Sequence, residues 1–317
     1  MNRKNLTAAV LAGLAGAAGL AGTAQAVNLN PDGLGQVLVY PYYTTNGGNQ
    51  TLISVVNTTE NAKAVKVRFL EGFNSREVLD FNLYMSHHDV WAAALYNSGG
   101  VATLVTHDNS CTVPYLYEMG PTPVSNIAYI DNGGAFDYED GGPTVIERAA
   151  EGHFEMIEMA TIEPGSDTEE NVTHTNVDHD DDEDTDPVWM PLDCEQLVEN
   201  WTRTEDFLPY GDWTCGVYNQ PDQCEENRID MDRNTGGLFG GAAIVNSQDG
   251  TMYSYNAQAI QGFDKSDGGL HREPGSIYPS LNSGDQNTAY VFFGVPRNEV
   301  ERIKYLRPVG AVSAVFM

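Results

Sequence analysis

Short runs of apolar, β-branched and aromatic residues, separated by turn signals, dominate the sequence after residue 26. Turn pairs such as Asn46-Gly47 and Asp249-Gly250 favour the positive φ angles found in tight connections between antiparallel strands. The runs between such turns read as strands: Gln36 to Tyr43, Thr51 to Asn57, Ala64 to Leu70, Val78 to Tyr84, Ala102 to Thr106, His153 to Ile162, Ala242 to Asn246, Thr251 to Ile260 and Thr288 to Val295. The pattern predicts an all-β protein built from antiparallel, immunoglobulin-like β-sandwich units with a few short helices.

The run Val65 to Phe69 indicates how one strand is placed, because apolar residues alternate with the cations Lys66 and Arg68. Successive side chains of a strand point to opposite faces, so the apolar residues share one face and the cations share the other. We expect a half-buried strand in a sheet with one wet side. Glu155 and Glu158 are likewise expected in water.

Helical signals are short and scattered. Ser86-x-x-Asp89 is spaced to cap a turn before Trp91 to Leu95, and Leu192 to Trp201 and Asn298 to Leu306 have helical patterns. None of the three is long enough to organise the fold.

The composition changes abruptly between Glu163 and Pro187, a segment with eleven carboxylates and no Lys or Arg. It has too little apolar surface to offset its ordering entropy. We expect an exposed acidic linker between an N-terminal β-sandwich domain (27–162) and a C-terminal β-rich domain (188–317), or else a solvated loop. The apolar ending at Met317 leaves open both a truncated reading frame and a final buried strand.

The first 26 residues predict export. Arg3 and Lys4 precede an apolar stretch from Leu6 to Leu20, and Ala24-Gln25-Ala26 supplies a small-x-small cleavage pattern. We interpret residues 1–26 as a signal peptide, with a retained anchor as the alternative, and expect a periplasmic, cell-surface or extracellular protein. No later run has the roughly 20 apolar residues of a membrane helix.

Without this signal, 14 Lys and Arg stand against 45 Asp and Glu, a formal charge of −31. Such a surface repels nucleic acid and anionic lipid headgroups. The partners that remain are a glycan or another surface protein.

Four cysteines in an exported chain are an even set that oxidation can pair. Among the three pairings that exist, we favour Cys215 with Cys224, across a turn-rich loop, and Cys111 with Cys194.

Calcium is the expected metal, since it binds several oxygen ligands from a flexible loop. The two candidate sets are Asp230, Asp232 and Asn234, and Asp180, Asp182 and Asp184. Neither has the glycine at the sixth position and the glutamate at the twelfth position of an EF-hand loop, so solvated turns are the alternative.

The densest group of histidines and carboxylates consists of His87, His88, Asp89, His107 and Asp108. Two imidazoles and a carboxylate suit zinc, and one histidine suits a general base, if the two segments converge. Adjacent residues of a strand face opposite sides, so His87 and His88 favour a surface role.

Six segments stand out as recognisable strand motifs: Val37 to Tyr43, Thr51 to Thr58, Val65 to Glu71, Val78 to Asn82, Gly152 to Met159 and Gly236 to Gly240. Together they resemble a family of uncharacterised secreted or cell-surface proteins of Gram-negative bacteria. The resemblance covers most of the mature chain, and the family has no assigned activity. It therefore implies no functional residue.

The sequence contains no G-x-S-x-G, H-E-x-x-H or phosphate-loop motif. We expect an exported, non-enzymatic surface or secreted protein with a structural, adhesive or ligand-binding role. The alternative is a calcium-supported extracellular polysaccharide hydrolase, which two facing carboxylates in a cleft would indicate.

Overall fold

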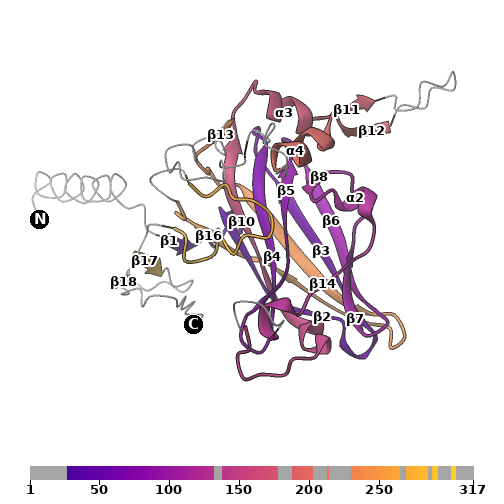
Figure 1. The fold of residues 1–317 in the computed structure, drawn as a ribbon. Helices are drawn as coiled ribbons and strands as arrows, with labels where there is room; N and C mark the ends of the chain where they lie inside the picture. The colour runs from indigo at the N-terminus through magenta and orange to yellow at the C-terminus, as the bar shows by residue number, and fades with distance from the viewer. Residues whose placement is uncertain are drawn as a thin grey trace, which may run out of the picture.

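The computed structural model describes residues 27–131, 138–177, 188–202, 213, 230–264, 269–284, 288–291 and 301–304. In this part the chain forms two β-sheets packed face to face, with a few short helices (Figure 1). The predicted signal peptide lies outside the described residues. No described helix has the length and apolar character needed to cross a membrane.

The larger sheet has ten strands: β1 (Val27–Leu29), β2 (Val37–Thr44), β4 (Lys63–Glu71), β5 (Glu77–Met85), β8 (Cys111–Val113), β10 (Glu151–Ile162), β13 (Met231–Asp232), β16 (Gln258–Gln261), β17 (Thr288–Val291) and β18 (Glu301–Lys304). Their order is β18-β17-β1-β16-β2-β10-β4-β5-β8, with β13 paired to the end of β10. Pairing is antiparallel apart from the parallel pair β1 and β17.

The smaller sheet has six strands: β3 (Asn49–Asn57), β6 (Val90–Ser98), β7 (Val101–Val105), β9 (Thr122–Pro123), β14 (Leu238–Asn246) and β15 (Thr251–Asn256). Their order is β15-β14-β3-β6-β7-β9. A separate hairpin and the short helices complete the described elements: β11 (His174–Val177), β12 (Val188–Pro191), α2 (Leu116–Met119), α3 (Asp167–Val172), α4 (Cys194–Asn200) and the 3₁₀ turns Asn46–Gly48, Ile127–Tyr129 and Ile146–Ala150.

Strands from both sides of the acidic segment build the same two sheets. β14 pairs with β3 in the smaller sheet, and β16 pairs with β2 in the larger one. The predicted division into 27–162 and 188–317 therefore does not follow the sheets. The described part of the acidic segment, residues 163–177, forms α3, whose Thr168 and Val172 are buried, and strand β11. The composition break therefore does not mark a boundary between two sheets.

Two of the three predicted helices are not helices. Residues Trp91–Leu95 belong to strand β6, where every second side chain is buried. This alternation of buried and exposed side chains is that of a strand, and it outweighs the capping signal at Ser86 and Asp89. In the third, 298–306, residues Glu301–Lys304 form β18. The predicted helix 192–201 is α4, whose first turn is capped by the Asp193 carboxylate accepting from Gln196 N at 3.0 Å.

Aromatic rings fill the space between the sheets. Tyr40 stacks on Phe154 with ring centroids 4.1 Å apart, and Phe154 stacks on Phe69 at 4.8 Å. The Tyr40 hydroxyl crosses to the other sheet and donates to the Ser54 carbonyl at 2.8 Å. A Cβ at residue 240 would lie 1.9 Å from this hydroxyl, so only glycine fits at Gly240.

The other face of the larger sheet is covered, which corrects the expectation of a wet side. All nine residues of β4 are buried, Lys66 and Arg68 included. Lys66 pairs with Asp80 and donates to the Glu273 carbonyl at 3.2 Å, and Arg68 pairs with Glu77. The cover comes from segments distant in sequence, which the local alternation of β4 cannot reveal.

The acids of β10 are buried as well, where water was expected. Glu155 pairs with Arg68, and Glu158 lies 2.7 Å from Lys63 with both side chains fully inaccessible. Glu158 also accepts from the backbone N–H groups of Thr235 at 3.0 Å and Gly236 at 2.7 Å. Full pairing explains how these charges are tolerated inside.

Candidate functional site: a pocket at one end of the sandwich

A pocket of about 460 Å³ lies at one end of the sandwich, between the β5–β6 turn, the loop joining β7 to β8 and the β11–β12 hairpin. The side chains that line it come from all three segments: Ser86, His87, His88, Asp89, Val90, His107, Asp108, Asn109, His174 and Trp189. The structure thus brings together the five residues that the sequence grouped and adds His174 and Trp189.

The first wall is the tight turn between β5 and β6. The Asp89 carboxylate holds this turn, accepting from Ser86 N at 3.2 Å and from Val90 N at 2.8 Å. His88 has a φ of 52°, in the left-handed region that non-glycine residues rarely adopt. The turn places the His87 and His88 side chains in solvent at the mouth of the pocket.

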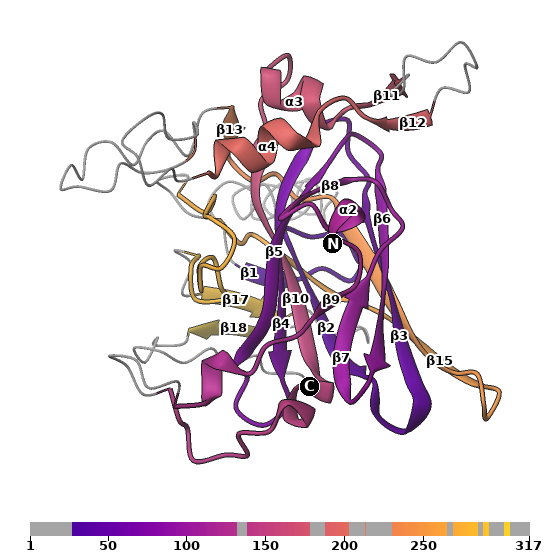
Figure 2. The ribbon, with the colours of Figure 1, turned by 45° about the vertical axis from the view of Figure 1, so that its right-hand side comes forward.

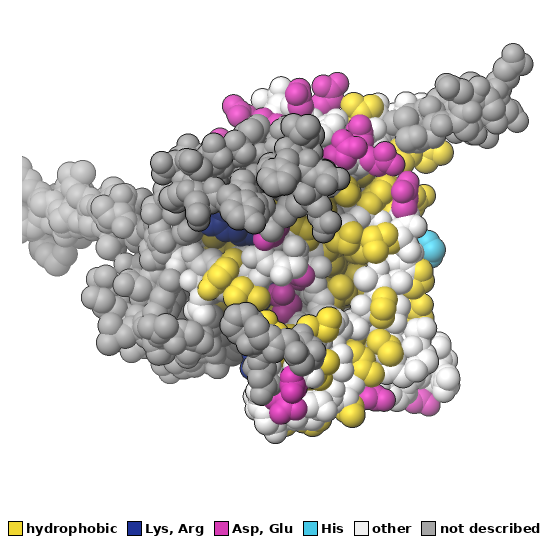
Figure 3. All heavy atoms as spheres, viewed as in Figure 1, with side chains coloured by type: hydrophobic (Ala, Val, Ile, Leu, Met, Phe, Trp, Pro, Cys, Tyr) yellow, Lys and Arg dark blue, Asp and Glu magenta, His cyan; other side chains and the backbone are white. Residues whose placement is uncertain are grey.

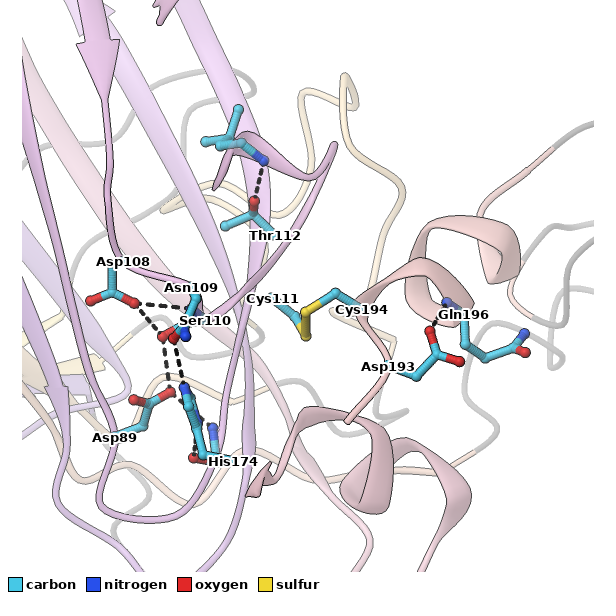
Figure 4. Close-up of a disulfide and its surroundings, with 12 residues drawn as sticks. Asp89, Asp108, Asn109, Ser110, Cys111, Thr112, His174, Asp193, Cys194 and Gln196 are labelled. Carbon is cyan, nitrogen blue, oxygen red and sulfur yellow. Dashed lines mark hydrogen bonds between the residues drawn. A yellow bond between two sulfur atoms is a disulfide. The ribbon is translucent and has the colours of Figure 1, made fainter. Parts of the chain in front are cut away.

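The second wall is held by Asp108 and Ser110. The Asp108 carboxylate accepts from Ala92 N at 3.0 Å, from Ser110 N at 3.0 Å and from the Ser110 hydroxyl at 2.6 Å. The same hydroxyl lies 3.2 Å from the Asp89 carboxylate (Figure 4). A hydroxyl has one proton, so Ser110 donates to one of these two carboxylates at a time, and the shorter contact is the one to Asp108.

Burial is the main influence on Asp89 and raises the pKa of its carboxyl. His174 acts against this rise, and the negative charge of Asp108 adds to it.

His174, at the start of β11, ties the hairpin to the sandwich. Its Nδ1 lies 3.1 Å from the Ser86 hydroxyl and its Nε2 lies 3.2 Å from Asn109 Oδ1 (Figure 4). The Asn109 amide nitrogen donates to the Trp189 carbonyl at 2.9 Å, which fixes the orientation of this amide. Nε2 of the neutral imidazole therefore carries the hydrogen, and Nδ1 accepts from Ser86.

A disulfide lies directly behind the pocket and joins Cys111 of β8 to Cys194 of α4 (Figure 4). This is the pairing that the sequence favoured, and its Cα atoms are 5.1 Å apart. The other predicted bridge, Cys215 to Cys224, lies outside the described residues. The observed bridge fastens the segment after the acidic run to the sheet that supports the pocket.

The exposed rings give the pocket its chemical character. The Trp189 side chain is 65% exposed, and the imidazoles of His87, His88 and His107 face solvent beside it. Such groups combine flat apolar surfaces with polar nitrogens. They suit a ligand with both apolar faces and hydrogen-bonding groups.

Neither His174 nor Trp189 stood out in the sequence. They lie on either side of residues 178–187. Only the pairing of β11 with β12 and the packing of this hairpin place them beside the first two walls. No spacing rule reaches across residues 178–187.

The residues proposed for calcium are partly engaged elsewhere. The Asp230 carboxylate accepts from the Thr168 hydroxyl at 2.8 Å, Asp232 is exposed, and the buried Asn234 amide donates to the Phe263 carbonyl at 2.7 Å. Asp180, Asp182 and Asp184 lie outside the described residues. In the described ranges no group of three or more His, Cys, Asp or Glu side chains is placed to hold a metal. Calcium binding stays a prediction.

Comparisons of the chain with known protein families, with curated proteins and with solved structures found no match.

Proposed function

We propose that the protein is an exported, non-enzymatic binding protein whose end pocket takes a glycan. Trp189 carries this proposal, because its largely exposed ring stands at the rim of a pocket lined with imidazole and amide groups. The apolar face of a sugar ring stacks on a flat aromatic side chain, while its hydroxyls bond to polar groups around it. Adhesion to a glycan-bearing surface is the corresponding role.

Charge narrows the class of glycan. Asp89 and Asp108 lie in the pocket wall, and acidic side chains gather at the same end of the molecule, over α3 and α4 (Figure 3). Like charges placed opposite each other disfavour binding. Neutral or amino sugars are therefore favoured over acidic ones.

Binding is favoured over catalysis because the two carboxylates already hold the pocket walls. Asp89 accepts two backbone N–H groups and Asp108 accepts two more. His88 Nε2 lies 3.0 Å from the Glu60 carboxylate, so the exposed rings of Trp189, His87 and His107 are the groups best placed to meet a ligand.

Export is supported by the Cys111–Cys194 disulfide, which fits an oxidising compartment. The signal peptide, the resemblance to secreted and cell-surface proteins of Gram-negative bacteria, and an immunoglobulin-like class for the sandwich belong to the same proposal.

The test is binding of the mature chain to immobilised neutral, amino and acidic glycans. We expect retention on neutral or amino glycans, and a loss of at least about tenfold in affinity for Trp189→Ala. Tyr253→Ala is the matched control, since Tyr253 is 66% exposed and does not line the pocket. Equal retention of the parent and the Trp189 variant contradicts the proposal.

A polysaccharide hydrolase is the second candidate, and the pairing of Asp89 with Asp108 favours it. Because Ser110 contacts both, two of their oxygens lie within about 6 Å, near the separation of retaining glycosidases. The raised pKa of Asp89 suits a general acid. Release of reducing ends from a bound glycan, abolished by Asp89→Asn, would establish hydrolysis. The dependence of this hydrolysis on calcium is measured by comparing its rate in calcium chloride with its rate in sodium chloride of matched ionic strength.

A further inference from the structure

The outward side chains of β15, β14, β3, β6 and β7, which we call the neutral face, include no Asp, Glu, Lys, Arg or His. The chain as a whole has 45 Asp and Glu and 16 Lys and Arg, so this absence is notable. The registers between strands align small and apolar residues across its centre: Gly241, Ser54 and Ala92 in one row, and Ala243, Leu52 and Ala94 in the next.

The neutral face is open to solvent over β3, β6 and β15, whereas its outward residue Thr103 on β7 is buried. Leu52 at its centre is 44% exposed, and Val90 and Met252 nearer its margins are 50% and 71% exposed. β3 and β15 form the right-hand border of the molecule in Figure 2. The larger sheet differs, because its own outer face is covered and its charges there are buried in pairs. An uncharged face of this kind, with Leu52, Val90 and Met252 exposed among small and polar residues, suits an interaction site.

Charge identifies the occupant. A cationic or an anionic partner finds no opposite charge to pair with on this face. A second copy offers the same uncharged surface, and the repulsion between two acidic copies is least where their uncharged faces meet. We propose that two copies of this protein associate through the neutral face.

A twofold axis suits this surface, because the same patch then serves both copies. Two sheets pack face to face about 10 Å apart, and small residues such as Ala92, Ala94 and Ala243 permit this approach. Five strands about 4.8 Å apart and about five residues long cover roughly 400 Å² on each copy. The pair buries roughly 800 Å², below the standard size of a specific interface, so the dimer is weak and reversible.

Salt distinguishes this interface from an ionic one. The long-range repulsion between two acidic copies is screened by salt, whereas apolar contacts persist. The dimer therefore tightens as sodium chloride is raised, while an assembly held by ion pairs loosens.

Sedimentation velocity of the mature chain, over a concentration series in low (about 0.05 M) and high (about 1 M) sodium chloride, tests the proposal. We expect the dissociation constant to fall at least about tenfold at high salt. Leu52→Asp, and independently Ala92→Asp, should weaken the dimer at least about thirtyfold, because each sets two carboxylates against an apolar partner surface. Ile127→Asp is the control, adding the same charge at a 57% exposed position outside the neutral face.

Circular dichroism and melting of each variant monitor folding, and having two face variants keeps the test decisive if one of them unfolds. A monomer under every condition overturns the proposal. So does a dimer that both face variants leave intact, or one that Ile127→Asp weakens equally. Loss of the dimer with Tyr253→Pro alone would assign it to pairing along the β15 edge. Face-dependent retention of a monomer on an insoluble neutral polysaccharide would assign the face to that polymer.

Discussion

Glu71, the last residue of β4, organises the loop that follows it. Its carboxylate accepts from the backbone N–H groups of Phe73 at 2.6 Å, Asn74 at 3.0 Å and Arg76 at 2.9 Å, and from the Arg148 guanidinium at 2.9 Å. Burial by itself would raise the pKa of Glu71, but these hydrogen bonds lower it to about 2.

Replacing Glu71 by Gln should reduce the free energy of unfolding at pH 7 by about 2 to 3 kcal/mol, since the buried donors lose a charged acceptor. The folded-state pKa is depressed, so the carboxylate stabilises the fold above the unfolded value near 4.5, and this contribution is lost as pH falls towards 2. Denaturant unfolding at pH 7, 4 and 2.5 should show the difference shrinking. Exposed Glu147→Gln is the control; a difference independent of pH refutes this account.

The fully buried ion pair between Lys63 and Glu158 leads to a second prediction. Lys63→Met leaves the Glu158 charge buried without its cation, and should destabilise the protein by about 3 to 5 kcal/mol. Arg76→Met, at a guanidinium that is 40% exposed and 3.4 Å from Asp140, should cost less than about 1 kcal/mol. Chemical denaturation of both variants measures the contrast, and similar losses would mean that burial of the pair does not matter.

Residue patterns alone could not have revealed that the charged face of β4 is buried. The alternation in Val65 to Phe69 correctly separates two faces of β4, but it cannot say what packs on the second one. That cover includes the segment from Arg272 to Gly275, whose backbone bonds to Asn82 and Asp80. Local sequence carries no record of such distant contacts.

At the scale of elements, period-two patterns predicted most strands, and errors arose where the chain changes sheet. The predicted strand Thr251 to Ile260 is two strands, β15 in the smaller sheet and β16 in the larger one, separated at the buried Ala257. In the candidate site, the turn and loop residues were grouped correctly because β5, β6 and β7 are neighbours in sequence. The β11–β12 hairpin joins them only through tertiary packing.

The disulfide should hold this hairpin and α4 in place. A Cys111→Ala/Cys194→Ala variant should lose about 4 to 5 kcal/mol of stability, because the bridge closes a loop of 83 residues in the unfolded chain. Thermal melting of the oxidised parent, the reduced parent and the variant measures this. The reduced parent should resemble the reduced variant, since reduction also opens the predicted Cys215–Cys224 bridge in both chains. An oxidised variant as stable as the oxidised parent would refute the expectation.

The whole molecule must fold against its own charge. With a formal charge of −29, which becomes −31 without residues 1–26, self-repulsion favours expanded states, and salt weakens it over a Debye length of about 8 to 10 Å at moderate ionic strength. We expect the melting temperature to rise as sodium chloride is raised from near zero to about 1 M. Potassium chloride should act equally, since screening is not specific to the ion, and a melting temperature that falls with salt contradicts this reading.

The bridge between Cys111 and Cys194 also decides how the chain responds to a mechanical load. Force applied at the two ends passes through the sulfur atoms, so the chain between these two cysteines, which are 83 positions apart and enclose the central strand β10, cannot be drawn out. Reduction would release roughly 280 Å of additional contour length. The oxidised molecule is therefore a shorter tether than its sequence length implies, and its middle strand stays inside a covalent ring even after the sheets have been pulled apart.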